Sequence, residues 1–325
     1  MRELLLMTFA PAQTWLQVLL LIIGIIVVLK GADLLTAGAV GMAERIGVPQ
    51  IIIGLTIVAM GTSMPEFFVS LMSAINGTPD LAVGNIVGSN IFNALLIVGC
   101  AAMVAPITIQ KSTVKKDIPV AVFASVLLMA MTLDGHISRI DAAILFIVFI
   151  AYMWITLRGA KHGGAEEPSA QEKKKPMNVG KAVLLIVIGL VCLVLGSDVF
   201  VDNATAIAHA MGISDAVIGL TIVAGGTSLP ELATSVVAAK KGNSGIAIGN
   251  VLGSNVFNIL MILGVTGLIT PMTISGITMV DLSMMVISMI LLWLFSFTKY
   301  RIQRWEGVVL TVIFIGYISW LIVNA

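Results

Sequence analysis

The chain contains two copies of one unit, offset by 165 residues. Two blocks recur without a gap: IGLTIVAMGTSMPE (53–66) and VGNIVGSNIFN (83–93) return as IGLTIVAGGTSLPE (218–231) and IGNVLGSNVFN (248–258). The same offset places Asp33 on Asp198 and Pro106 on Pro271. A match of this length at one offset indicates an internal duplication. The second half is therefore expected to repeat the fold of the first.

Each copy consists mainly of apolar runs. Of the 325 residues, 58% are hydrophobic and only 11% are charged. A soluble domain of this size needs far more charge on its surface, whereas a membrane-spanning helix needs about 20 apolar residues. We predict an all-α membrane protein with ten transmembrane helices, at about 15–40, 48–75, 80–104, 117–133, 140–158, 180–207, 213–239, 245–269, 278–297 and 305–323.

One hydrophilic stretch, GAKHGGAEEPSAQEKKKP, separates the copies. Its Gly, Pro, Ser and charge content is typical of a solvated linker. We therefore divide the chain into a first five-helix repeat at 1–158, a cytoplasmic linker at 159–179 and a second five-helix repeat at 180–325. An odd number of spans per repeat places the second repeat in the membrane upside down.

The positions of lysine and arginine support this inverted arrangement. With the linker in the cytoplasm, all but three of the 18 Lys and Arg residues lie inside. Arg2 and Arg139 lie outside, and Lys30 lies within a span. Cytoplasmic loops carry an excess of basic residues, so we expect both termini to be extracytoplasmic, in a plasma (inner) membrane. The net charge of +1 gives no indication of nucleic-acid binding.

The motif G-T-S-x-P-E interrupts the second and seventh predicted spans with a carboxylate, at Glu66 and Glu231. A charged side chain at the centre of a membrane helix costs about 2.5–3.5 kcal/mol on insertion scales. A bound cation compensates this cost, and Ca²⁺ is bound by oxygen ligands at about 2.3–2.6 Å. Two intramembrane glutamates at equivalent positions therefore predict a metal-ion site; the alternative is that each is protonated and structural.

Further oxygen atoms accompany each glutamate. Hydroxyls precede it by four and three residues and so lie on its helix face: Thr62 and Ser63, and Thr227 and Ser228. A proline before each glutamate lacks an N–H and releases a carbonyl one turn back, and we expect such carbonyls to include those of Ala59 and Ala224. The third and eighth spans carry Ser and Asn at i, i+4: Ser89 and Asn93, and Ser254 and Asn258. Small-xxx-small steps in the same spans allow close helix approach: Gly84 and Gly88, and Gly249 and Gly253.

Other polar residues give weaker indications. Lys30 and Asp33, at i, i+3, are interpreted as a structural pair rather than as ion ligands. Asp198 and Asp202 either line an ion path or belong to the interior of the sixth span, and the sequence does not decide between these roles. No Gly-rich phosphate loop, nucleophile–His arrangement or Cys/His cluster occurs in the sequence. We therefore expect neither enzymatic activity nor a cofactor.

In these motifs the sequence resembles the sodium/calcium exchangers of the cation/calcium antiporter superfamily, in its prokaryotic branch. The resemblance covers essentially the whole chain. It implies that both glutamates coordinate ions together with the hydroxyl, amide and carbonyl oxygens named above. It also implies that the first and sixth spans slide across a more rigid core of eight helices. Some relatives carry Asp where this chain has Asn258. In the family, Asp at this place is associated with potassium-dependent exchange, so we do not expect K⁺ coupling.

The expected function is exchange of Ca²⁺ for Na⁺ by alternating access, with the ions bound near the membrane midplane. A Ca²⁺ (cation)/H⁺ antiporter on the same scaffold is the nearest alternative, since a buried carboxylate binds protons readily. A cation channel is a third possibility. The expected ligands are Ca²⁺ and Na⁺ with surrounding lipid, and no obligatory protein partner is indicated.

Overall fold

The computed structural model describes residues 13–160, 177–211 and 224–324. The predicted linker therefore lies largely outside the described residues, as does the beginning of the seventh predicted span. The elements of the first half are α2 (Thr14–Ile46), α3 (Gln50–Ile53), η1 (Gly54–Val58), α4 (Ala59–Thr62), α5 (Met64–Ile75), α6 (Pro79–Ile91), η2 (Phe92–Ile97), α7 (Val98–Val104), β1 (Ile107–Thr108), α8 (Lys111–Lys115), α9 (Asp117–Met131), β2 (His136–Ile137) and α10 (Arg139–Ala160).

The second half repeats this order with nearly the same bounds. Its elements are α11 (Val179–Ala210), α13 (Ala224–Thr227), α14 (Leu229–Lys240), α15 (Ser244–Val256), η4 (Phe257–Ile262), α16 (Leu263–Ile269), β3 (Met272–Thr273), α17 (Met279–Ser296), β4 (Arg301–Ile302) and α18 (Arg304–Asn324). The starts of α2, α5, α6, α7 and α10 recur as those of α11, α14, α15, α16 and α18 at the 165-residue offset that relates the sequence blocks. The two copies therefore share one local structure.

Seven helices in the described residues are long and apolar enough to cross a membrane. The pair Gln50–Thr62 and Met64–Ile75, bent by 47°, passes the same test as an eighth. The fourth predicted span corresponds to α9, which has only 15 residues. The fold is thus that of a predominantly helical membrane protein, while the full set of ten spans and the inverted orientation of the second repeat stay predictions.

The bend in the second predicted span follows from its sequence. Pro65 is the second residue of α5, where a missing N–H is tolerated. It lacks the donor that would otherwise bond the Gly61 carbonyl, so α4 ends at Thr62 and α5 begins afresh at Met64. Leu229 and Pro230 begin α14 in the same way. Each helix break lies directly before a glutamate of the G-T-S-x-P-E motif.

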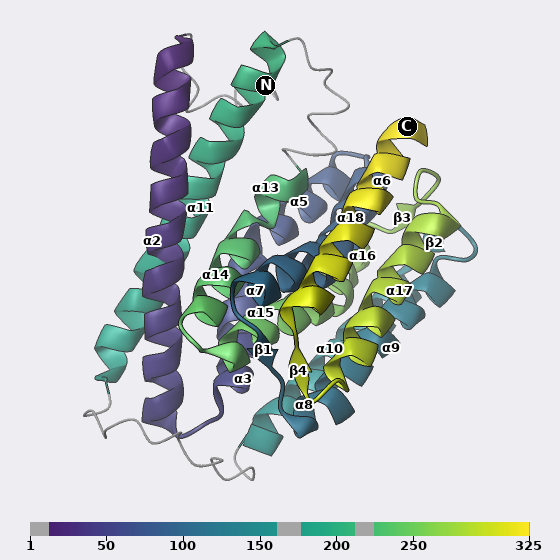
Figure 1. The fold of residues 1–325 in the computed structure, drawn as a ribbon. Helices are drawn as coiled ribbons and strands as arrows, with labels where there is room; N and C mark the ends of the chain where they lie inside the picture. Colours follow the sequence, from purple (N-terminus) through teal and green to yellow (C-terminus); the bar gives the residue numbers. More distant parts are fainter. Residues whose placement is uncertain (1–12, 161–176, 212–223, 325) are drawn as a thin grey trace.

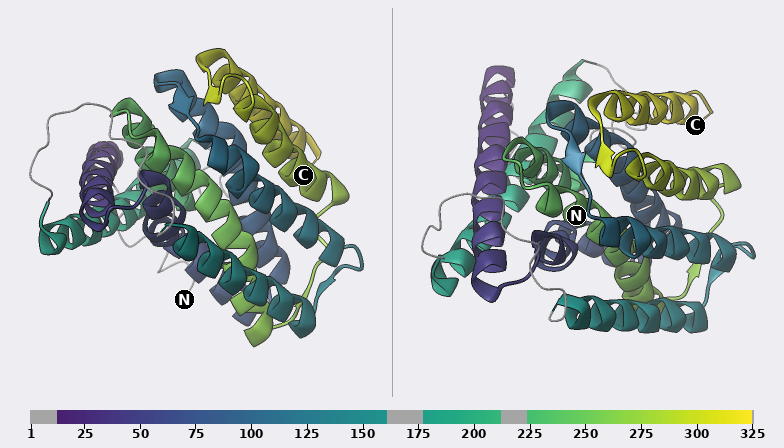
Figure 2. Two further views of the ribbon diagram at one scale, coloured as in Figure 1. Left: turned by 90° about the horizontal axis from the view of Figure 1, so that it is seen from below. Right: turned by 60° about the horizontal axis from the view of Figure 1, so that its bottom comes forward.

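The helices surround α15, which is the most buried segment. In the most apolar 18 residues of the span Ser244–Ile269, 94% of the residues are buried, against 17% in the corresponding 18 residues of Arg304–Val323. Figures 1 and 2 show α15 inside the group of helices and α18 at its surface. Gly249 and Gly253 bring α15 against the second predicted span, because an added Cβ would lie 3.0 Å from Gly54 Cα and 2.6 Å from the Leu55 carbonyl oxygen. The predicted close approach is confirmed for these two glycines, whereas Gly84 and Gly88 meet no backbone within 4 Å among the described residues.

The described residues also include four short strands that the all-α prediction did not include. Strand β1 pairs antiparallel with β4, and β2 pairs antiparallel with β3. In the first pair Ile107 lies opposite Ile302, and in the second Ile137 lies opposite Met272. Each pair joins one strand from each repeat. The two registers are related by the 165-residue offset, so each repeat pairs one equivalent strand with the other repeat at each site.

Helices α2 and α11 lie side by side at one flank of the remaining helices (Figure 1). Small residues seven apart on each helix face one another: Gly24 opposite Gly196, Gly31 opposite Gly189, and Gly38 opposite Ala182. A Cβ added at Gly31 would lie 2.8 Å from the Gly189 carbonyl oxygen, and one added at Gly189 would lie 2.6 Å from the Leu35 nitrogen. Backbone therefore touches backbone along this antiparallel pair, which we call the glycine seam.

The interpretation of Lys30 and Asp33 as a pair was wrong. Asp33 instead forms a salt bridge with Lys241, the residue that follows α14, with a distance of 2.9 Å between Oδ1 and Nζ. Residues three apart on a helix are near one another, but a partner from another helix can be better placed. Of the two undecided aspartates, Asp202 is buried, with 8% of its surface exposed, and Asp198 is exposed.

Candidate ion-binding site

Glu66 and Glu231 occupy equivalent positions in the first turn of α5 and of α14. Only 1% of each side chain is exposed. The N-terminus of a helix carries unpaired N–H groups and a partial positive charge, which favour a carboxylate there. The two carboxylates are nevertheless close enough for their negative charges to repel one another. The sequence motif thus folds into two buried acids that face a common region.

Each carboxylate is hydrogen-bonded from the opposite repeat. Ser63 Oγ donates to Glu231 Oε1 at 2.9 Å, and Ser228 Oγ donates to Glu66 Oε1 at 2.9 Å. The sequence placed each serine beside the glutamate of its own helix, and the structure corrects this. The break between α4 and α5 directs Ser63 away from its own helix neighbour and across the repeat boundary.

The remaining predicted hydroxyls lie in the same region. Ser254 Oγ is 3.5 Å from Glu231 Oε1, and Ser228 Oγ also bonds Ser89 Oγ at 3.2 Å. Thr62 hydrogen-bonds Asn250 Oδ1 at 3.0 Å. Thr62 and Thr227 also contact the glutamates of the opposite repeats, Glu231 and Glu66. The structure therefore brings the predicted Thr, Ser and Glu side chains of both repeats together.

Four buried oxygens of the predicted ligand residues, on elements that pack against one another, have no hydrogen-bond partner: Glu66 Oε2, Glu231 Oε2, Asn93 Oδ1 and Asn258 Oδ1. They form two repeat-related pairs, and both asparagines are 1% exposed. A buried polar atom without a partner costs about 1–3 kcal/mol, and more when it is charged. All four atoms are acceptors. An arrangement of unpaired oxygen acceptors suits a hard cation. We call these four atoms the oxygen cluster.

The carbonyls expected at Ala59 and Ala224 are a different case. The Ala59 carbonyl accepts a hydrogen bond from the Ser63 N–H at 3.0 Å and lies 3.4 Å from Thr62 Oγ1. The proline therefore does not release it, because the donor that Pro65 lacks would have bonded Gly61. Ala224 is the first residue of α13, and its side chain lies outside the described part of the structure.

Sequence reasoning missed two asparagines that support the glutamates. Asn85 Nδ2 donates to the Glu66 carbonyl oxygen at 3.3 Å and to Ser70 Oγ at 3.0 Å. Asn250 Nδ2 makes the same two bonds, to the Glu231 carbonyl at 3.3 Å and to Ser235 Oγ at 3.0 Å. The signal was present, because an amide recurs at this place in both copies of the G-N-x-x-G-S-N motif. Each fixes the start of its glutamate helix against the neighbouring helix.

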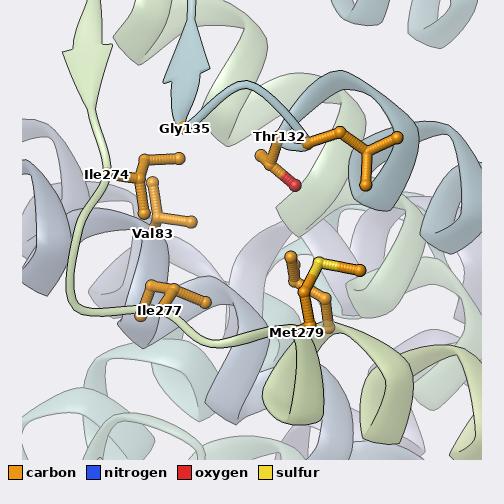
Figure 3. Close-up of a pocket in the computed structure, with 8 residues that line it drawn as sticks. Val83, Thr132, Gly135, Ile274, Ile277 and Met279 are labelled. Carbon is orange, nitrogen blue, oxygen red and sulfur yellow. The ribbon is translucent and has the colours of Figure 1, made fainter.

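A cavity of about 190 Å³ (Figure 3) has none of the four oxygen-cluster residues among those that line it. It is lined mostly by apolar side chains, among them Val83, Ile274 and Ile277. The hydroxyl of Thr132 at its wall is bonded to the carbonyls of Leu128 and Met129. No carboxylate or amide side chain lines it, so the oxygen cluster is the better candidate. Among the described residues there is no group of three or more His, Cys, Asp or Glu side chains that could hold a metal.

Comparison with known proteins identifies the family of this arrangement. The family model of the sodium/calcium exchanger protein matches residues 16–158 and again residues 181–323. The chain is 37% identical over 312 residues to the inner membrane protein YrbG of Escherichia coli, covering 93% of this chain and 94% of the relative. It is 33% identical over 339 residues to the sodium/calcium exchanger MaX1 of Methanosarcina acetivorans, covering 92% and 97%.

Solved structures of the sodium-calcium exchanger NCX_Mj have the same fold. One, obtained without Na⁺ and Ca²⁺, superposes with a TM-score of 0.83 at 34% identity and covers 95% of this chain and 100% of the other. Both the sequence and the structure therefore match over nearly their full length. The chain belongs to the sodium/calcium exchanger protein family of membrane antiporters.

Proposed function

We propose that this protein exchanges Ca²⁺ for Na⁺ across the membrane by alternating access, at a site near the midplane built from both repeats. The observation that carries the proposal is the oxygen cluster, in which one carboxylate oxygen and one amide oxygen from each repeat are buried without a partner. Ser89, Ser254 and the Thr and Ser side chains of both G-T-S motifs complete the proposed ligand set.

The charge of the cluster accounts for the coupling of the two fluxes. Glu66 and Glu231 supply two negative charges that either one Ca²⁺ or several Na⁺ neutralise. An empty site would leave two buried charges unpaired, and burying an unpaired charge is strongly unfavourable. The change between inward- and outward-open states is therefore favoured when the site is loaded. Each ion shifts these states only through its different affinity for them.

We propose that α2 and α11 move together as one unit across the other helices. The glycine seam supports this, since backbones that touch along three steps resist separation. The ten-span topology, the inverted second repeat and the extracytoplasmic termini are parts of the same proposal. The distribution of Lys and Arg supports this orientation.

Purified protein in liposomes tests the coupling. With Na⁺ inside, none outside and equal pH on both sides, we expect rapid uptake of ⁴⁵Ca²⁺, and little uptake when choline replaces the internal Na⁺. Replacing external K⁺ with choline is expected to leave the rate unchanged, because Asn258 supplies a neutral ligand. Uptake that follows a pH gradient and ignores Na⁺ contradicts the proposal and supports Ca²⁺/H⁺ antiport. Uptake without any counter-ion, and without exchange against unlabelled Ca²⁺, indicates a channel.

A further inference from the structure

Two buried asparagines, Asn90 and Asn255, connect the repeats through hydrogen bonds to the two asparagines of the oxygen cluster. Asn258 Nδ2 donates to Asn90 Oδ1 at 3.1 Å, and Asn93 Nδ2 donates to Asn255 Oδ1 at 3.0 Å. Neither Asn90 nor Asn255 has any exposed surface. Each therefore holds the amide of the opposite repeat. We call Asn90 and Asn255 the crossed amide brace.

The backbone fixes which way the brace amides point. Asn90 Nδ2 donates to the Asn255 backbone carbonyl at 3.3 Å, and Asn255 Nδ2 donates to the Asn90 backbone carbonyl at 3.4 Å. A backbone carbonyl can only accept. If a brace amide turned over, its oxygen would face this carbonyl oxygen and a hydrogen bond would become a repulsion. Each brace residue must therefore direct its nitrogen to the backbone and its oxygen to the ligand amide.

This orientation passes on to Asn93 and Asn258. Because a brace oxygen faces each of them, each must present its amide nitrogen to the brace. Its own oxygen then points the other way and has no partner, which is the state observed for both Asn93 Oδ1 and Asn258 Oδ1. Turning the amide to hide this oxygen would break the bond to the brace. The brace thus keeps these two amide oxygens of the oxygen cluster without a hydrogen-bond partner.

We propose that Asn90 and Asn255 are positioning residues that aim the amide oxygens of Asn258 and Asn93 at the transported ions. Because they require a hydrogen-bond donor at positions 93 and 258, they also disfavour an ionised carboxylate there and keep the site at the two charges of Glu66 and Glu231. This inference rests on the proposed function. It adds that each repeat orients an ion-binding amide of the other repeat.

The coupling between residues tests the brace. Ca²⁺ affinity is measured from the rise in thermal stability of the purified protein as Ca²⁺ is added, since a ligand that binds only the folded state stabilises it. Asn90→Leu is expected to weaken Ca²⁺ binding about tenfold, which corresponds to about 1.4 kcal/mol, and Asn258→Ala by a similar factor. Because Asn90 acts through Asn258, the double variant is expected to bind no worse than Asn258→Ala alone.

A second double variant is the matched control. Asn93 is only three residues from Asn90 but is held by Asn255, so the losses from Asn90→Leu and Asn93→Ala should multiply to about a hundredfold. If Asn90 only supported the fold, the effect of Asn90→Leu on Ca²⁺ affinity would combine in the same way with Asn258→Ala and with Asn93→Ala. Gln50→Leu removes another hydrogen bond between the repeats, to Asn243, and is expected to leave Ca²⁺ affinity unchanged.

The outcomes separate this inference from the function on which it rests. If Ca²⁺ does not stabilise the unmodified protein, the proposed function fails. If Ca²⁺ stabilises it and Asn90→Leu binds Ca²⁺ equally well, or the losses from Asn90→Leu and Asn258→Ala multiply, the brace is overturned. Should Asn90→Leu not fold, Asn90→Ser replaces it, because the smaller polar side chain removes the amide with less disturbance. We expect the same non-additivity with Asn258→Ala and the same additivity with Asn93→Ala, with smaller losses of Ca²⁺ affinity.

Discussion

Glu66→Gln and Glu231→Gln each abolish Na⁺-dependent Ca²⁺ uptake while folded protein remains in the membrane. Glutamine keeps the shape of the side chain and an acceptor for the serine of the opposite repeat, but removes one of the two charges that neutralise the ion. Removing one partner of a buried charge pair costs about 2–5 kcal/mol, so Ca²⁺ affinity should fall at least about thirtyfold.

The stability of the ion-free protein distinguishes this effect from misfolding. Without an ion, the two buried carboxylates repel one another and lack water, and a neutral side chain removes part of this cost. Thermal unfolding without Ca²⁺ should therefore occur at the same or a higher temperature in both variants. Substantial residual Na⁺-dependent flux would count against the oxygen cluster as the ion site.

Glu306→Gln is the matched control. Glu306 is fully buried, and its Oε1 has no hydrogen-bond partner, while its Oε2 accepts from the Gln303 N–H at 2.7 Å. The chemical change and the degree of burial are the same as at Glu66. Glu306 lies in the first turn of α18, outside the oxygen cluster. We expect transport at close to the unmodified rate, since burial of a carboxylate alone does not make it an ion ligand.

Gly189→Ala impairs transport through the glycine seam, far along the chain from either glutamate. The added Cβ would lie 2.6 Å from the Leu35 nitrogen and 2.8 Å from the Gly31 carbonyl oxygen, so α2 and α11 must move apart. Overpacking of this kind costs about 1–3 kcal/mol. We expect a lower unfolding temperature and at least about a tenfold loss of Ca²⁺ flux.

Gly316→Ala provides the comparison for this substitution. Gly316 lies within α18, and apart from the neighbouring backbone of α18 itself no atom of the described residues lies within 4 Å of a Cβ placed there. Alanine is a better helix former than glycine by about 1 kcal/mol, so the unfolding temperature should be unchanged or raised and the flux retained. If Gly189→Ala transports as well as Gly316→Ala, α2 and α11 need not remain in contact during the cycle.

The sequence singled out the glutamates and hydroxyls that the structure brings together, because the relevant signals are local. A glutamate in an apolar run, with Thr, Ser and Pro before it, is visible in one copy and repeated in the other. The hydrogen-bond partners of these side chains were not predictable in this way. Helical spacing relates Ser63 to Glu66, whereas the bond that forms is to Glu231, because a helix break turns the serine outward.

Contacts between distant segments account for the other differences. Lys30 is close to Asp33 in sequence, but Lys241 reaches Asp33 from the end of α14. Asn90 and Asn255 lie inside a motif that the sequence singled out, yet their role depends on each facing the backbone of the other. The strands β1–β4 have two residues each, too few for a period-two pattern to show.

The reciprocal strand pairs restrict how access to the site can change. Figure 1 shows β1 with β4 and β2 with β3 at different ends of the group of helices. Because strand pairs join the two repeats at both ends, the repeats are not expected to separate by a hinge motion at either end. Helices α2 and α11 carry none of these paired strands and lie together at one side of the other helices (Figure 1). In the proposed alternating-access cycle, these two helices are therefore the ones expected to carry the gate, and cross-linking them to the helices beside them should arrest transport.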